Sequence, residues 1–210
     1  MPLAESFDVG AIAICGPTCS GKSTLVQALA ARWPSMFAPI VTTTTRLPRP
    51  GEVPGRDYHF VSRDQFEQYA AHGELVESDE FSGHWYGIRR DELRRLADSG
   101  RVGVAALTPN GIDPIRTACA VLGRRLVTVY VAATRQELTA RLLQRYRADR
   151  EARAAHYARR LLHLLDSQST WQSAYPYEIV EPDFNARTLE SVVQRIHIAA
   201  APRSMANHHD

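Results

Sequence analysis

Cysteine is scarce in this sequence, which has three, Cys15, Cys19 and Cys119, among 210 residues. They show no close C-x-x-C spacing of the kind that binds zinc, and such a small, odd number does not indicate a disulfide framework. A few scattered thiols are typical of a reducing compartment. We therefore expect a cytoplasmic protein.

The sequence also lacks an excess of one charge and a long apolar run. It has 25 Lys and Arg against 23 Asp and Glu, a net charge of +2, which gives no general attraction to nucleic acid or membranes. Residues 1–10 contain no basic segment, and the apolar run after them is too short to span a membrane. We expect neither nucleic acid nor membrane as a partner. No coiled-coil heptads mark an interface, so the oligomeric state stays open.

What is present is an alternation of apolar runs and helical stretches that fits one α/β domain over residues 1–210. Residues 11–15 form a short apolar run between two glycines, as in a strand buried on both faces, and Leu25, Leu29 and Trp33 follow at helical spacing. Further apolar runs cover residues 102–107, 126–131 and 178–180. The segments with helical composition are residues 89–99, 136–150, 153–171 and 188–199. This alternation predicts a parallel sheet flanked by helices.

Two segments depart from that alternation. Residues 42–88 are rich in turns and aromatic residues, which predicts an inserted, small antiparallel subdomain. Residues 145–155 are strongly basic without an apolar stripe, so we expect a helical lid over residues 141–160. Residues 200–210 read as a flexible tail.

The clearest motif is a phosphate-binding loop between the first strand and the first helix. The pattern GxxxxGK[ST] is matched throughout by Gly16, Pro17, Thr18, Cys19, Ser20, Gly21, Lys22 and Ser23, and Thr24 follows. Backbone amides of such a loop and the helix N-terminus point at phosphate oxygens. Lys22 would reach the β- and γ-phosphates, and Ser23 would bind Mg²⁺. We therefore predict a P-loop NTPase core that binds ATP with Mg²⁺.

A second anion site is indicated in the loop after residue 42. Arg46 and Arg49 lie three residues apart across a proline turn, and two guanidinium groups on one loop suit bidentate capture of a phosphate monoester. The residues alone leave a solvated basic loop as an equal alternative.

Taken with these arginines, the sequence resembles guanylate kinases over residues 11–195. The resemblance is densest in three motifs that occur in order, TTRLPRPGE, GRDYHFVSRDQFE and GELVESDEFSGHWYG, at residues 44–52, 55–67 and 73–87. Residues 42–88 would then bind the acceptor nucleotide. Several separate motifs in the same order argue against a chance similarity.

The resemblance implies a set of acceptor-binding residues. Residues that match those holding the GMP phosphate are Arg46, Arg49, Tyr58 and Tyr86, and those that match the readers of the guanine edge are Thr42 and Glu77. A carboxylate accepts hydrogen bonds from guanine N1–H and N2–H₂, and adenine offers no such paired donors. Taken singly, each of these residues has a structural alternative, such as a core position for the tyrosines and a surface position for Glu77.

The resemblance also implies lid arginines. Arg141 and Arg145 lie four apart on a predicted helix, hence on one face, and match the arginines that close on the transferring phosphoryl group. Arg159 or Arg160 is a candidate for a third. The alternative is a solvated basic helix. Together, Lys22, Arg46, Arg141 and Arg145 are the predicted catalytic residues.

The departures from the family pattern concern the metal and the purine. An Asp-x-Asp pair is replaced by Ala106 and Thr108, so that we expect weaker Mg²⁺ placement, for which Asp79 or Glu80 is a candidate substitute. Ile88 stands where a Ser or Thr contacts guanine, and this predicts a more apolar purine pocket. Cys19 replaces a P-loop glycine, the acidic lid run is replaced by residues 146–151, and an Asn expected to touch adenine is replaced by Glu181 or Pro182.

The sequence thus predicts ATP-dependent phosphoryl transfer to GMP or a related or modified purine nucleotide. A ribose 1,5-bisphosphate phosphokinase is a second hypothesis, because those enzymes are similar and also lack the Asp-x-Asp pair. A non-catalytic binding module is a third, which the intact P-loop disfavours.

Overall fold

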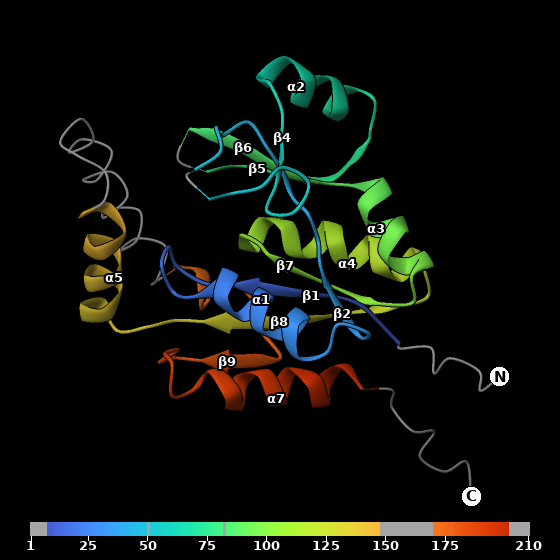
Figure 1. Cartoon of the computed structure of the whole chain (residues 1–210). Helices are drawn as coiled ribbons and strands as arrows, with labels where there is room; N and C mark the ends of the chain where they lie inside the picture. Colours follow the sequence, from blue (N-terminus) through green and yellow to red (C-terminus); the bar gives the residue numbers. More distant parts are fainter. Residues whose placement is uncertain (1–7, 50, 82, 148–169, 202–210) are drawn as a thin grey trace, which may run out of the picture.

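The computed structural model describes residues 8–49, 51–81, 83–147 and 170–201. It has an α/β architecture in which a five-stranded parallel sheet is covered by helices and a smaller four-stranded sheet lies beyond one of its faces (Figure 1). The predicted α/β class with a parallel sheet and an inserted small subdomain is confirmed.

The large sheet has the strand order β2-β7-β1-β8-β9. Its central strand β1 (Val9–Cys15) pairs in parallel with β7 (Val102–Ala106) and β8 (Arg125–Val131). The short strands β2 (Phe37–Pro39) and β9 (Ile179–Glu181) form the edges. Because helices cover both faces, the central strands are almost entirely apolar, as the sequence predicted; the exceptions are Arg125 and the buried Thr128 of β8.

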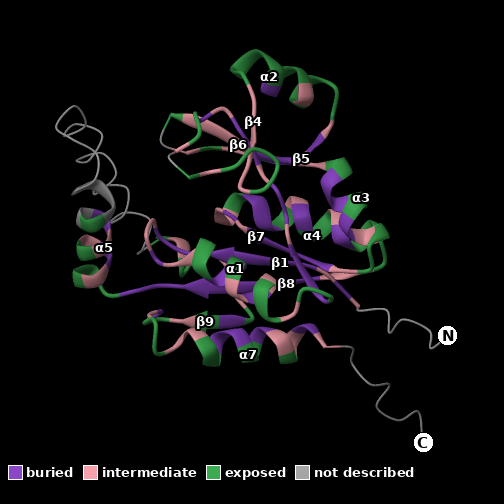
Figure 2. Cartoon of the chain, viewed as in Figure 1, coloured by how far each residue is buried: buried purple, intermediate pink, exposed green. Residues whose placement is uncertain are grey.

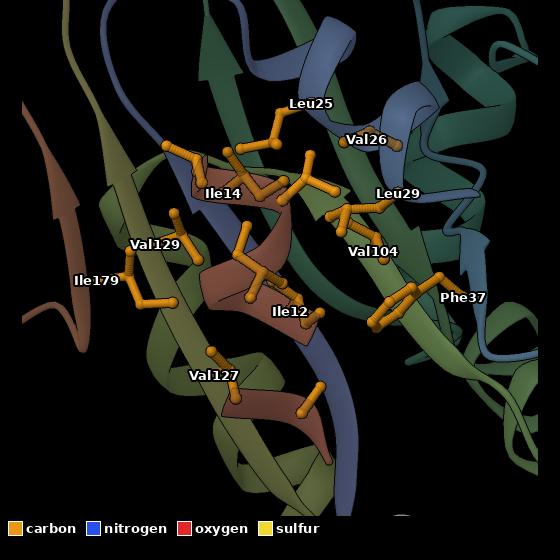
Figure 3. Packing of buried hydrophobic residues seen from close by; sticks show 14 of the residues in the cluster. Ile12, Ile14, Leu25, Val26, Leu29, Phe37, Val104, Val127, Val129 and Ile179 are labelled. Atoms are coloured by element: carbon orange, nitrogen blue, oxygen red, sulfur yellow. The ribbon is translucent and has the colours of Figure 1, made fainter. Parts of the chain in front are cut away.

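Alternate residues of β1 point to opposite faces and enter separate cores. Ile12 and Ile14 pack with α1 (Lys22–Arg32) and α7 (Leu189–Ala200), in the cluster shown in Figure 3. The smaller Ala11 and Ala13 pack with α3 (Arg90–Asp98) and α4 (Ile112–Val121) on the other face. Figure 2 shows the buried strands between these two layers. The P-loop therefore follows directly after β1, the strand that lies buried between these two layers.

The small sheet has the order β4-β3-β6-β5 and is mixed rather than antiparallel. The hairpin of β5 (Leu75–Phe81) and β6 (His84–Arg89) is antiparallel, as is the pairing of β6 with β3 (Thr43–Thr44). The short strand β4 (His59–Phe60) pairs with β3 in parallel. The prediction of a purely antiparallel subdomain is therefore wrong for this one pairing.

The same segment contains a helix that the sequence reading missed, α2 (Arg63–Ala71). Ser62 caps it, because its Oγ accepts a hydrogen bond from the backbone N–H of Gln65. Only Phe66 of this helix is buried, so its sequence carries almost no apolar periodicity.

A short 3-10 turn at Pro109–Gly111 follows β7, and α5 (Arg135–Arg147) follows β8. Of the predicted lid, only residues 141–147 are described, as the end of α5; residues 148–160, with Arg159 and Arg160, lie outside the described residues. Of the predicted tail, Ala200 is instead buried at the end of α7, and residues 202–210 lie outside the described part. Within the described ranges, no helix has the length and apolarity needed to cross a membrane.

Candidate active site

A cavity of about 640 Å³ lies where the end of the P-loop faces the small sheet. One part of its lining comes from the P-loop and the start of α1, and another from the segment predicted to bind the acceptor, including Thr42, Arg49 and Tyr58. The end of β7 contributes Ala106, Leu107 and Thr108. The P-loop and the predicted acceptor-binding segment, which separate motifs indicated in the sequence, therefore line the same cavity.

The backbone of the P-loop needs the two glycines of the motif. Gly16 has φ 145°, and a Cβ there would lie 2.0 Å from the carbonyl oxygen of Val131. Gly21 has φ 103°, and a Cβ would lie 2.6 Å from Cε1 of Phe184. Cys19 has φ 64° and is, among the described residues, the non-glycine residue with positive φ. The structure thus shows why a glycine suits position 19, and the cysteine there adopts a conformation that costs about 1 kcal/mol or more.

Lys22 lies over its own loop. Its Nζ donates to the carbonyl oxygens of Gly16 at 2.7 Å and Pro17 at 2.8 Å. The following residues Ser23 and Thr24 are exposed and line the cavity, so their hydroxyl groups are accessible to a ligand. A loop of this kind, with a lysine at its rim and a helix N-terminus behind it, binds phosphate.

The donor set fits Mg²⁺ only in part. Mg²⁺ keeps several waters and is commonly held by a few protein oxygens together with substrate phosphates, which suits the Ser23 hydroxyl. The end of β7 offers Ala106 and Thr108 and hence no carboxylate there. Among the described residues no group of three or more His, Cys, Asp or Glu could hold a metal ion.

Arg141 projects from α5 onto the P-loop. Its Nη1 donates to the backbone carbonyl oxygens of Cys19 and Ser20 at 3.3 Å each. Its Nη2 donates to the backbone carbonyl oxygen of Phe184 at 2.9 Å. Arg141 also lines the cavity. Arg145 lies one turn further along α5, and its side chain is outside what the structure describes.

On the acceptor side, five of the six predicted residues line the cavity: Thr42, Arg49, Tyr58, Glu77 and Tyr86. The sixth, Arg46, is not in the lining and is only 7% exposed. It donates to both carboxylate oxygens of Glu52 at 2.9 Å, and its guanidinium carbon lies 5.1 Å from the ring centre of Tyr58. Arg46 therefore lies behind the residues that are predicted to bind the acceptor phosphate.

Glu77 is a buried carboxyl group in the cavity wall, 9% exposed. Burial raises the pKa of Glu77 to about 7; the charge of Asp79 also raises it, while a hydrogen bond from the Ile88 backbone lowers it. The surface position considered for Glu77 is therefore wrong. A group that changes charge near neutral pH inside a cavity is typical of a functional site.

Ile88 does not belong to the cavity. Its side chain is fully buried in the core with residues of α3 and α4, and it is not in the cavity lining. The prediction that Ile88 makes the purine pocket apolar is wrong in this structure. Glu181 and Pro182 are likewise absent from the lining, and Glu181 pairs with Arg195 at 3.3 Å.

The sequence reading named Asp79 only as a possible metal substitute and missed several wall residues altogether. Glu77, Asp79 and Phe81 line the cavity from alternate positions of β5, and the exposed Glu80 points to the other face. The period of two along this strand was the signal that could have found them. Further residues of the lining are Trp171, Phe184, Asn185, Ala186 and Leu189.

A parallel sheet with a P-loop at the end of β1, facing a small second sheet across one cavity, defines the class of P-loop nucleoside monophosphate kinases. The guanylate kinase family model matches residues 10–196. A guanylate kinase of Nostoc sp. is 35% identical over 188 residues, covering 90% of this chain and 87% of the relative. One of Chlamydia felis is 32% identical over 170 residues, covering 81% and 79% respectively.

The crystal structure of a guanylate kinase from Anaplasma phagocytophilum has the same fold, with a TM-score of 0.65 at 23% identity, covering 93% of this chain and 85% of that one. The chain belongs to the guanylate kinase family, whose enzymes phosphorylate GMP with ATP.

Proposed function

We propose that this chain is a guanylate kinase that moves the γ-phosphoryl group of ATP to GMP, with Lys22 and Glu77 at the two ends of one cavity. The observation that carries this function is the joint lining: a phosphate-binding loop and a buried carboxylate suited to guanine face the same space of about 640 Å³. Phosphoryl transfer depends mainly on positioning and charge neutralisation, which such a cavity supplies.

On the donor side, the P-loop amides from Gly16 to Thr24 and the Lys22 ammonium group would hold the ATP phosphates. Lys22 already lies within hydrogen-bond distance of two loop carbonyls, so it needs only to turn from these to a phosphate oxygen. Ser23 would hold Mg²⁺, which neutralises charge on the phosphates when bound. Arg141, fixed on the P-loop, and Arg145 on the same helix would stabilise negative charge in the transition state.

On the acceptor side, Arg49, Tyr58 and Tyr86 would bind the GMP phosphate, and Thr42 and Glu77 would bind guanine. Arg46 would act indirectly, through Glu52. Arg46 is paired with Glu52, and Glu52 also accepts a hydrogen bond from the backbone N–H of Arg49 at 2.7 Å. This pairing fixes the loop that presents Arg49. No general base is needed, because the acceptor phosphate is already anionic at pH 7.

The cavity also bears on the other acceptors. Burial of Ile88 in the core removes one reason for a modified purine. Glu77 favours a nucleotide over ribose 1,5-bisphosphate, because a sugar phosphate has no paired ring donors for it. The intact P-loop favours catalysis over a pure binding module.

The test is ADP release from MgATP with a panel of acceptors: GMP, dGMP, IMP, AMP and ribose 1,5-bisphosphate. We expect GMP to give the highest kcat/KM, AMP to be poor, and Lys22→Ala to lose nearly all turnover. Faster turnover of ribose 1,5-bisphosphate than of GMP would contradict the proposal. Tight ATP binding with no transfer to any acceptor would establish the binding module instead.

A further inference from the structure

Glu77 and Asp79 present two carboxyl groups to one short loop. Asp79 Oδ2 accepts hydrogen bonds from Thr108 Oγ1 at 2.5 Å and Asn110 Nδ2 at 3.3 Å. Glu77 lies against the same loop, because a Cβ on Gly111 would be 3.2 Å from Glu77 Oε2. The two groups therefore lie side by side in the cavity wall; we call them the carboxyl pair.

Hydrogen bonds to one carboxylate oxygen of Asp79 fix the orientation of its side chain and leave its other oxygen, Oδ1, to accept further bonds. Both donors bind Oδ2, and within the described part of the chain no residue donates to Oδ1. Asp79 lines the cavity and is only partly buried, so Oδ1 is available to a ligand. Two acceptors next to each other in a partly buried wall suit a ligand with several donors in a row or a cation.

The surroundings favour a ligand with several donors. The described residues supply no third acidic, His or Cys group that would complete a metal site around the carboxyl pair. Guanine, in contrast, has three consecutive hydrogens on one edge, N1–H and the two of the 2-amino group. Glu77 accepts N1–H and one amino hydrogen, and the second amino hydrogen needs another acceptor.

We propose that Asp79 is a specificity-determining residue that accepts the second hydrogen of the purine 2-amino group, and that Thr108 holds Asp79 in place for this contact. The inference rests on the proposed function and concerns the same cavity. It assigns to Asp79 on β5 a role at the purine, where a carboxylate is lacking at position 108.

The decisive comparison is GMP against IMP, which has the same 6-oxo edge but no 2-amino group. In Asp79→Asn the amide oxygen would face Thr108, and its NH₂ group would meet the amino group donor to donor. We expect kcat/KM for GMP to fall about tenfold or more, as for loss of a hydrogen bond to a charged group. The value for IMP should change by less than about twofold, so the preference for GMP shrinks.

Glu80→Gln is the matched control, because Glu80 is an exposed carboxylate on the opposite face of β5. It should leave both values unchanged. Equal losses for GMP and IMP in Asp79→Asn would overturn the inference while leaving the guanylate kinase function intact. A wild-type protein that phosphorylates neither nucleotide would overturn the proposed function, and this inference with it.

Thr108 gives an independent test that does not alter a charge. Thr108→Val removes the hydroxyl at nearly constant shape and should lower the preference for GMP over IMP severalfold, whereas Thr108→Ser should restore it. A purely structural role of Thr108 would lower both substrates together and would overturn the positioning role. Thermal unfolding of each variant, with and without ATP, verifies that the variant is folded and that its P-loop still binds ATP.

Discussion

Glu77 is a carboxyl group whose buried surroundings disfavour the charged form that its proposed contact with guanine needs. Burial, aided by the charge of Asp79, raises its pKa from 4.5 to about 7, so that the folded protein favours the neutral acid. Accepting hydrogen bonds from guanine requires the carboxylate. The surroundings of Glu77 therefore conflict with its proposed role, and hydrogen-bond donors of a bound purine would relieve this conflict.

This conflict predicts a pH dependence of activity. Because kcat/KM reports ionisations of the free enzyme, its value for GMP should rise with pH and level off above a pKa near 7. Glu77→Gln should lose most GMP turnover and this part of the profile. Ser78→Ala, at the exposed neighbouring position, serves as the control and should keep the profile. A flat profile between pH 6 and 8 in the wild type would contradict the assignment.

The same group predicts a pH dependence of stability. Between pH 4.5 and about 7 the folded state binds more protons at Glu77 than the unfolded state, so the free energy of unfolding falls as pH rises through this window. The loss reaches about 3 kcal/mol, since one pKa unit corresponds to about 1.4 kcal/mol. Chemical unfolding at pH 5 and pH 8 should show this loss in the wild type and a smaller one in Glu77→Gln. Equal losses in both proteins would assign it to other groups.

Glu52 contacts both Arg46 and Arg49, so the effect of replacing Glu52 can be predicted. Glu52→Gln leaves the buried Arg46 without its anionic partner, and the loop that carries Arg49 loses its anchor. We expect KM for GMP to rise about fivefold or more, KM for ATP to stay nearly constant, and stability to fall by about 3 kcal/mol. Glu67→Gln, in an exposed pair on α2, is the control and should change neither. A rise in both KM values would contradict a local role.

At the residue scale, five residues that the motif matches singled out line one cavity: Thr42, Arg49, Tyr58, Glu77 and Tyr86. The motif matches did not reveal that Arg46 stands behind the wall or that Ile88 faces the core. The position of Arg46 depends on its ion pair with Glu52. The side that Ile88 faces depends on the pairing of β5 with β6, whose register shifts between Leu75 and Glu77. Such an irregularity arises from contacts between strands and has no local signature.

At the element scale, the turn between β1 and α1 depends on a backbone that only glycine allows. Gly16→Ala would place a methyl group 2.0 Å from the Val131 carbonyl oxygen, in addition to its positive φ. We expect loss of ATP binding and of about 3 kcal/mol or more of stability. Gly100→Ala is the control, with φ 70° and open space around it; it should cost about 1 kcal/mol and keep ATP affinity. Calorimetry and thermal unfolding measure both, and similar losses would refute a packing cause.

Elements that pack by their own apolar pattern were predicted well, and those defined by distant pairing were not. The predicted runs 102–107 and 126–131 match β7 and β8 within a residue, because strands buried on both faces of a parallel sheet are mostly apolar. The helix α2 was missed since only Phe66 is buried. The parallel pairing of β3 with β4 was missed because strands of two residues carry no directional signal.

At the scale of the whole molecule, the two sheets should differ in local stability. The strand β1 is paired on both sides and packed on both faces, whereas β3 and β4 are only two residues long. Hydrogen exchange should therefore be slowest in β1, β7 and β8 and faster in the small sheet. GMP should slow exchange over residues 43–87, and ATP over residues 16–24, while α3, which contributes no residue to the cavity lining, serves as the unaffected reference. Equal exchange in both sheets, or protection of the same segment by both nucleotides, would contradict this division.

The shared cavity has a consequence for inhibition. Because the P-loop and the carboxyl pair open into one continuous space, a single molecule with two nucleosides joined by a chain of phosphates can reach both ends. Its second half would bind at an effective concentration set by the length of that chain, not by the bulk solution. The number of phosphates in the tightest inhibitor would then measure the distance at which the protein holds the donor and acceptor nucleosides during phosphoryl transfer.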